Sequence, residues 1–114
     1  MGDNHVVRFG GVRIEVLVDG AGPTVVLLPS LGRDSRDFDP VAQDLAAAGF
    51  RVLRPQPRGS GTSRGPLAGL DLHDLARDVA EVLEHLDAAP AVVAGHAFGH
   101  YVARVLAADR PDLV

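Results

Sequence analysis

The sequence lacks cysteine, lysine and tryptophan, and the first two absences exclude specific chemistries. Without cysteine, the chain forms neither disulfide bonds nor metal sites with thiolate ligands. Without lysine, it has no P-loop, because that motif uses a lysine to reach the phosphates of a nucleotide. All 11 basic residues are arginine. We attribute this bias to a GC-rich genome and do not expect the arginines to form a phosphate-binding set.

Long apolar runs are missing as well. No stretch approaches the roughly 20 apolar residues of a membrane-spanning helix, and residues 1–9 have no basic segment followed by an apolar run, as a signal peptide would. The net charge of −4 gives no reason to expect a nucleic acid or a membrane as a partner. With 46% hydrophobic and 23% charged residues, we expect a globular protein, and the absence of cysteine fits a cytoplasmic location.

Short apolar runs alternate with segments of helical periodicity, and glycine or proline separates most of them. We expect strands at Val6–Phe9, Arg13–Val18, Thr24–Leu28, Arg51–Leu53 and Ala91–Ala94. We expect helices at Phe38–Ala48, Leu72–Leu86 and Phe98–Ala108. After an opening hairpin, strands and helices alternate strictly. This order predicts an α/β fold, with a mostly parallel sheet flanked by helices.

The segment from Gly95 to Gly99 carries the most chemical information. A strand ends there, a sharp turn follows and a helix begins at once, with the two glycines spaced as in the G-x-S-x-G nucleophile elbow. Glycines suit these positions because the strand and the helix crowd them from both sides. The middle residue, however, is Ala97. A methyl group cannot attack a carbonyl carbon, so the turn lacks the usual nucleophile.

Three segments in this order resemble the α/β-hydrolase superfamily over essentially the whole chain. Residues 25–32 are similar to the third strand and oxyanion loop of that family, residues 54–63 to its D-x-R-G-x-G-x-S loop, and residues 95–99 to its elbow. The chain departs from the family pattern at Pro29-Ser30, where many members have His-Gly, and at Gln56, where they have Asp.

The resemblance implies a site around Ala97, which stands at the nucleophile position. The backbone N–H groups of Leu31 and Phe98 would form an oxyanion hole, which does not depend on side-chain identity. Ser30 and His100 are possible pocket residues, although His100 also fits a packed or partly exposed histidine. No cluster has metal-ligand spacing, and we expect neither a metal nor another cofactor.

The family's catalytic acid and histidine normally come from loops after later strands, which residues 1–114 do not include. We therefore expect residues 1–114 to be the N-terminal part of a single hydrolase domain, incomplete without later strands. The strand at residues 91–94 would then lie at an open sheet edge, which is an aggregation hazard. The expected partners are a small-molecule ligand or substrate and the remainder of the domain or a completing subunit.

The alanine leaves three interpretations open. The first is a hydrolase-like protein that acts on or binds a small ester, lactone or amide without a serine nucleophile. The second is an engineered serine-to-alanine variant of an ordinary serine hydrolase, and the third is a non-catalytic binding module, since fold does not fix function. We favour the first, because Pro29-Ser30, Gln56 and His100 also depart from the pattern. Enzymatic activity is left undecided.

Other polar features fit structural roles. Residues 59–65 are rich in glycine, but the third glycine comes one position too late for G-x-G-x-x-G, so a polar loop is the better interpretation. Arg58 and Arg64 are expected to be structural or solvated. The acidic residues from 71 to 87 are expected on the polar face of a helix, with surface pairs His73–Arg77 and Arg77–Glu81 at i, i+4 spacing.

Overall fold

The computed structural model describes residues 2–114 and contains every strand and helix expected from the sequence. The strands are β1 (Asp3–Phe9), β2 (Val12–Asp19), β3 (Thr24–Leu28), β4 (Arg51–Pro55) and β5 (Ala91–Gly95). The helices are α1 (Asp39–Ala47), α2 (Leu72–His85) and α3 (Phe98–Asp109), with a short 3₁₀ helix η1 (Ser35–Phe38) before α1. No helix within this part of the chain is long and apolar enough to cross a membrane.

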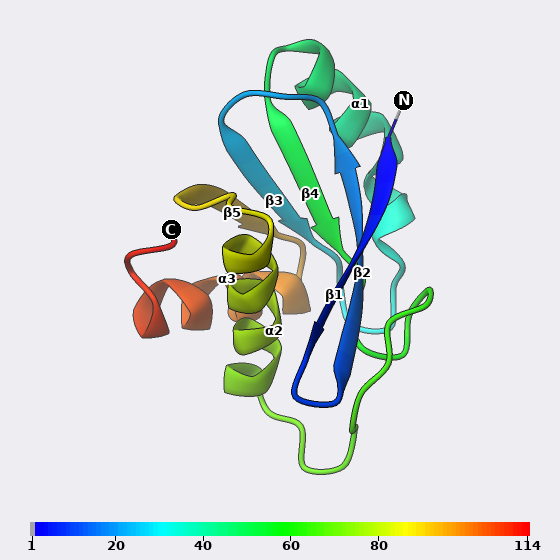
Figure 1. Cartoon of the computed structure of the whole chain (residues 1–114), viewed down its shortest axis with the longest axis vertical. Helices are drawn as coiled ribbons and strands as arrows, with labels where there is room; N and C mark the ends of the chain where they lie inside the picture. The colour runs from blue at the N-terminus through cyan, green and yellow to red at the C-terminus, as the bar shows by residue number, and fades with distance from the viewer. Residues whose placement is uncertain (1) are drawn as a thin grey trace.

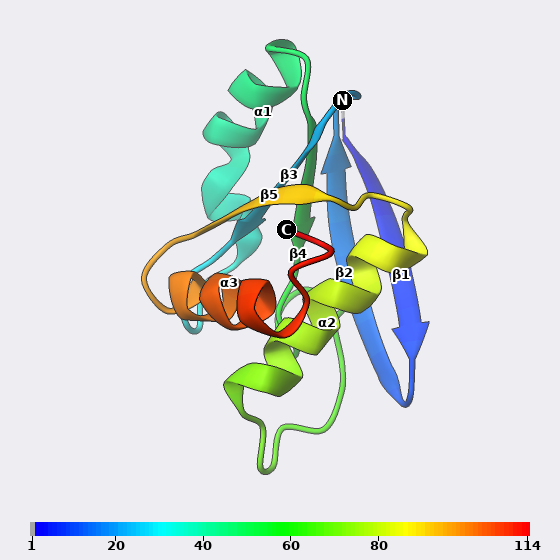
Figure 2. The ribbon, with the colours of Figure 1, turned by 90° about the vertical axis from the view of Figure 1, so that its left-hand side faces the viewer.

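The five strands form one mixed sheet in the order β1-β2-β4-β3-β5. β3 pairs in parallel with both β4 and β5, whereas β2 pairs antiparallel with β1 and β4. β2 therefore opposes the direction shared by the other four strands. Figures 1 and 2 show α1 on one face of the sheet and α2 and α3 on the other. The predicted α/β class is confirmed.

Two apolar cores fill the two faces of the sheet. The larger core lies under α2 and α3 and includes Val26 and Leu28, while the smaller lies under α1 and includes Val25 and Leu27. All five residues of β3 are buried, as expected for a parallel strand covered on both faces. α2 begins with a capping box, in which Asp71 and Asp74 each accept a hydrogen bond from the other's backbone N–H.

β5 lies at the edge of the sheet, next to β3. Its Val92 side chain is 65% exposed, so the open edge is also apolar. The Ala91 N–H at the start of β5 donates to the Leu113 carbonyl, and the rest of an edge of this kind offers unpaired N–H and C=O groups to another chain. The sequence analysis expected the strand at residues 91–94 to lie at an open sheet edge, and this placement agrees with it.

We predict that a polypeptide of residues 1–114 alone self-associates through β5. Val92→Lys should increase the monomer fraction, because a charge on an edge strand opposes further strand pairing. Size-exclusion chromatography with intact-mass measurement tests this. Val41→Lys is the matched control, since Val41 is 49% exposed but lies on α1, away from the edge. A monodisperse, cooperatively folding parent chain of 11.9 kDa would contradict the prediction.

An exposed ion pair joins α2 to α3. The His73 ring Nδ1 lies 2.6 Å from the Asp109 carboxylate, and this hydrogen bond raises the pKa of His73. The expected pairs of Arg77 with His73 and with Glu81 are not formed among the described residues, because His73 turns to α3 and Glu81 lies 3.4 Å from His85. His73 and His85 are both exposed.

The α2–α3 ion pair should make stability depend on pH. Because the folded-state pKa of His73 is raised, its contribution is fully present below the unfolded value of about 6.5 and is lost as the pH rises through the folded value. Titration of the His73 ring by NMR should show the raised pKa, and Asp109→Asn should return it toward the ordinary value. An unchanged His73 titration in Asp109→Asn would show that the pair does not form in solution.

Candidate functional site

A cavity of about 410 Å³ lies where the loops after β3 and β4 meet the beginning of α3. The loop after β3 contributes Ser30 and Leu31, and α3 contributes Phe98 and Gly99. The loop after β4 closes another side, with Leu67 near the opening. Leu31 and Leu67 are 70% and 60% exposed, so apolar side chains stand at the mouth. The carboxyl ends of parallel strands are the usual ligand site of α/β sheets.

The turn between β5 and α3 holds Ala97 in an unusual backbone conformation. Its φ is 50° and its ψ is −113°, outside the regions that residues with a side chain ordinarily occupy. The β3–β5 ladder continues into the turn through the His96 N–H, which donates to the Leu28 carbonyl at 3.0 Å. α3 then starts immediately, with the His100 N–H donating to the Ala97 carbonyl at 2.9 Å. Strain of this kind persists only where the surroundings over-determine it.

Gly95 and Gly99 allow β5, α3 and β3 to pack closely enough to impose that conformation. A Cβ on Gly95 would overlap the Gly99 carbonyl and the His100 nitrogen. A Cβ on Gly99 would overlap the carbonyl oxygens of Leu28 and Pro29. The glycines are therefore required by close backbone approach, as the spacing predicted.

Leu31 and Phe98, expected to supply an oxyanion hole, both line the cavity. Within residues 2–114, neither backbone N–H donates a hydrogen bond to another residue. The Phe98 N–H belongs to the first turn of α3, where amides have no partner inside the helix. Ser30 also lines the cavity. The structure thus brings Ser30, Leu31 and Phe98 together.

His100 is placed differently. It is exposed and is not among the residues that line the cavity, because on α3 the neighbours Gly99 and Val102 face inward. His96 is exposed as well and borders a second hollow, beside Ser30 and Asp37. Neither histidine has a hydrogen-bond partner for its ring among the described residues.

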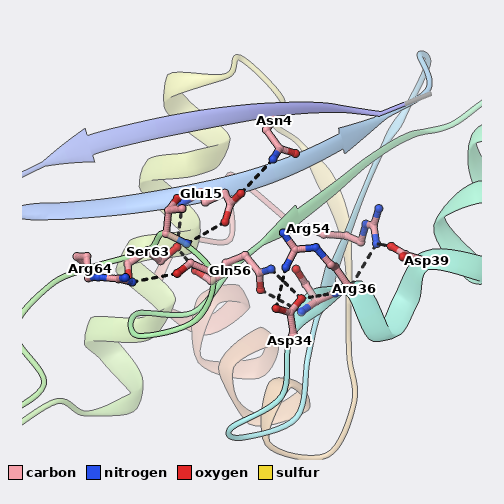
Figure 3. Close-up of polar contacts among 12 residues, drawn as sticks. Asn4, Glu15, Asp34, Arg36, Asp39, Arg54, Gln56, Ser63 and Arg64 are labelled. Carbon is pink, nitrogen blue, oxygen red and sulfur yellow. Dashed lines mark hydrogen bonds and ion pairs between the residues drawn. The ribbon is translucent and has the colours of Figure 1, made fainter.

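Buried Gln56 fixes the loop after β3 (Figure 3). Its side-chain oxygen accepts from the Ser35 N–H at 3.0 Å, and its side-chain nitrogen donates to Asp34 at 2.8 Å. Gln56 is fully buried, so both halves of its amide need partners. From the sequence, Gln56 was notable only because it stands where the hydrolase loop pattern has Asp. The structure shows that it ties the end of β4 to the segment that carries Leu31.

Buried Glu15 fixes the loop after β4, also visible in Figure 3. Its carboxylate accepts from the Thr62 N–H and from the Asn4 side chain, each at 3.0 Å. The Ser63 hydroxyl adds a second tie: it accepts from the Glu15 N–H at 2.9 Å and donates to the Gln56 carbonyl at 2.8 Å. The glycine-rich segment is therefore a structured polar loop and forms part of the cavity wall.

Arg58 and Asp78 form a buried ion pair that lines the cavity. Two arginine nitrogens reach the two carboxylate oxygens, at 2.7 and 2.9 Å, and a third donates to the Pro66 carbonyl. Burial raises the pKa of Asp78, while the guanidinium opposes that shift. The expectation that every acid of α2 lies on a polar surface was wrong for Asp78, which is 5% exposed. Sequence periodicity alone could not show that a loop arginine reaches this position.

Comparison with known proteins agrees with this architecture. A model of the alpha/beta hydrolase fold family matches residues 23–114. The chain belongs to the α/β-hydrolase fold family.

The residues described hold no cluster of three or more histidine or carboxylate side chains that could bind a metal ion.

Individual relatives are mainly hydrolases. The chain is 34% identical over 111 residues to a soluble epoxide hydrolase of Corynebacterium sp. strain C12, covering 97% of this chain and 38% of that protein. It is 30% identical over 108 residues to 2-(acetamidomethylene)succinate hydrolase of Mesorhizobium japonicum, covering 95% of this chain and 38% of that protein. An epoxide hydrolase structure from an endophytic Streptomyces superimposes with a TM-score of 0.91 at 30% identity, covering 98% of this chain and 34% of that chain. The chain thus spans little more than a third of these relatives.

The Arg58–Asp78 pair gives a stability prediction. Asp78→Ala should lower the free energy of unfolding by about 3–5 kcal/mol, because it leaves the Arg58 charge buried without its partner. The double variant Arg58→Met, Asp78→Leu should recover most of that loss, because it removes both charges and keeps apolar volume. Urea denaturation of the full-length protein measures both. A double variant no more stable than Asp78→Ala would show that the pair itself, rather than the unpaired charge, sets the stability.

Proposed function

We propose that this chain forms the N-terminal part of a hydrolase domain that acts on or binds a small ester-, lactone- or amide-type molecule without a serine nucleophile. The carbonyl oxygen of the ligand would accept hydrogen bonds from the Leu31 and Phe98 N–H groups. The acid and histidine of an ordinary triad would belong to chain beyond residues 1–114.

The observation that carries the proposal has two parts. The cavity keeps backbone N–H groups that can donate to a ligand, whereas residue 97 has no hydroxyl group that could act as a nucleophile. Among the described residues both amides lack a hydrogen-bond partner and border the cavity, beside a residue held at a positive φ. Preorganised donors of this kind stabilise negative charge on oxygen as it develops. Because Ala97 has only a methyl group, such a site binds a carbonyl oxygen without forming an acyl-enzyme at this position.

The rest of the cavity suits an uncharged, mostly apolar ligand. Leu67, Val79 and Val102 contribute apolar wall. The two charged residues among those that line it, Arg58 and Asp78, already neutralise one another. An ester, lactone or amide has this combination of an apolar body and one strong acceptor oxygen. The names of the relatives, epoxide hydrolases among them, agree with a small organic substrate.

Ala97→Ser in the full-length protein tests the proposal. We expect little gain in the hydrolysis of short-chain p-nitrophenyl esters, since the neighbouring departures Pro29-Ser30 and Gln56 point to a diverged site. Continuous absorbance assays of kcat/KM give the comparison. Ala94→Ser, which adds the same hydroxyl on β5 outside the turn, is the matched control.

The alternatives give different results in this assay. A rise of roughly 10³-fold or more in Ala97→Ser alone would favour an engineered variant of an ordinary serine hydrolase. Turnover by the alanine form itself would exclude a module that only binds. Saturable binding of an ester by both forms, with turnover by neither, would favour that module.

A further inference from the structure

Three arginines lie side by side on the sheet surface, outside the cavity. Arg8 on β1 is the register partner of Arg13 on β2, and Arg13 also forms an isolated β-bridge with Arg64 of the loop after β4. Directly paired residues of antiparallel strands project from the same face of a sheet. The three guanidinium-bearing side chains therefore start from one row across three segments. We call Arg8, Arg13 and Arg64 the arginine row.

Hydrogen bonding shows how closely the row is spaced. The Arg13 N–H and C=O both pair with Arg64, at 2.8 Å each. In a strand, the N–H and the C=O of one residue point toward the same neighbouring segment. Because both groups of Arg13 point toward Arg64, Arg13 and Arg8 form a non-hydrogen-bonded pair. The Cα atoms of such pairs are about 4.5 Å apart, against about 5.5 Å for hydrogen-bonded pairs. Like charges opposed at this spacing destabilise a sheet unless something neutralises them.

No carboxylate neutralises the row. Within residues 2–114, none lies within ion-pairing distance of Arg8, Arg13 or Arg64. Glu15 is the nearest acid of this face by register, two residues along β2, but its carboxylate is bound to Asn4 and Thr62. Figure 3 shows Arg64, Ser63 and Glu15 together beside β2. Counting Glu15, this part of the face keeps a formal charge of +2.

A second observation concerns the Arg13 guanidinium, the middle one of the row. Within residues 2–114 the Arg13 side chain makes no hydrogen bond, and because its Nε is enclosed by protein, a ligand would reach it through the terminal nitrogens. Arg64, by contrast, uses one nitrogen on the carbonyls of Gly61 and Ser63 and keeps its other donors. Arg8 is exposed.

We propose that the arginine row is a binding site for a phosphate-type dianion, either free phosphate or the phosphate group of a small molecule. Guanidinium groups match phosphate oxygens in geometry, with two parallel N–H donors for each contact. A phosphate group carries about −1.5 to −2 charge at pH 7, which balances the +2 of this face. The site departs from the expectation drawn from composition alone, in which no arginines were assigned to phosphate. It does not depend on the chemistry proposed for the cavity.

Thermal unfolding of the full-length protein in phosphate tests the site. At constant ionic strength, replacing chloride by phosphate at roughly ten times its Kd should raise Tm by about 3 °C. Arg8→Gln and Arg13→Gln should each weaken phosphate binding at least tenfold, measured by calorimetry. In chloride alone they should leave Tm unchanged or raise it, because they relieve repulsion within the row. A merely structural arginine would lower Tm when replaced.

Arg77→Gln is the matched control, since it removes an equal charge from an exposed position on α2. It should keep the full response to phosphate. Tighter binding of phenyl phosphate than of phosphate would identify a phosphorylated small molecule as the ligand class, and the reverse would identify free phosphate. No response in the parent protein, an equal response to acetate, or a response retained by Arg8→Gln and Arg13→Gln would overturn the proposal.

Discussion

Burial of β3 on both faces is the constraint on which the rest of the structure depends. One side of this strand faces the core under α1, and the other faces the core under α2 and α3. Its backbone pairs with β4 and with β5, so five neighbouring elements are arranged around it. The Leu28 carbonyl at its end then holds the turn to α3 by accepting from the His96 N–H. The cavity lies directly beyond that end.

The loops around the cavity are held by buried polar side chains rather than by apolar packing. Gln56 holds the segment after β3, and Glu15 with Ser63 holds the segment after β4. The Arg58–Asp78 pair joins the second loop to α2. A buried polar group fixes its partner strictly, because a lost hydrogen bond is not replaced by water. The cavity wall is therefore defined in position even where its outer residues, such as Leu67, are exposed.

The hydrophobic periodicity and the positions of glycine and proline were enough to predict the expected strands and helices, the fold class and the turn at Ala97. These features depend on residues close together in the chain. Contacts between distant segments could not be predicted in this way. Asp78 fits a helix surface by spacing, and only the folded loop shows that Arg58 covers it. The arginine row requires the register of β1 and β2 and the bridge to Arg64. His100 was ambiguous because a helix position near a turn does not fix which side it faces.

The conformation of residue 97 separates the shape of the turn from the chemistry of the side chain that it carries. The positive φ lies between Gly95 and Gly99, where the backbones pack too closely for a Cβ, while the Ala97 side chain is itself exposed. Serine and alanine therefore bear nearly the same backbone strain there. We therefore expect that adding or removing a hydroxyl at this position has little effect on the stability of the fold. At this turn the residues that shape the backbone, Gly95 and Gly99, are thus different from the residue that would carry a nucleophile, so the architecture does not depend on the chemistry of residue 97.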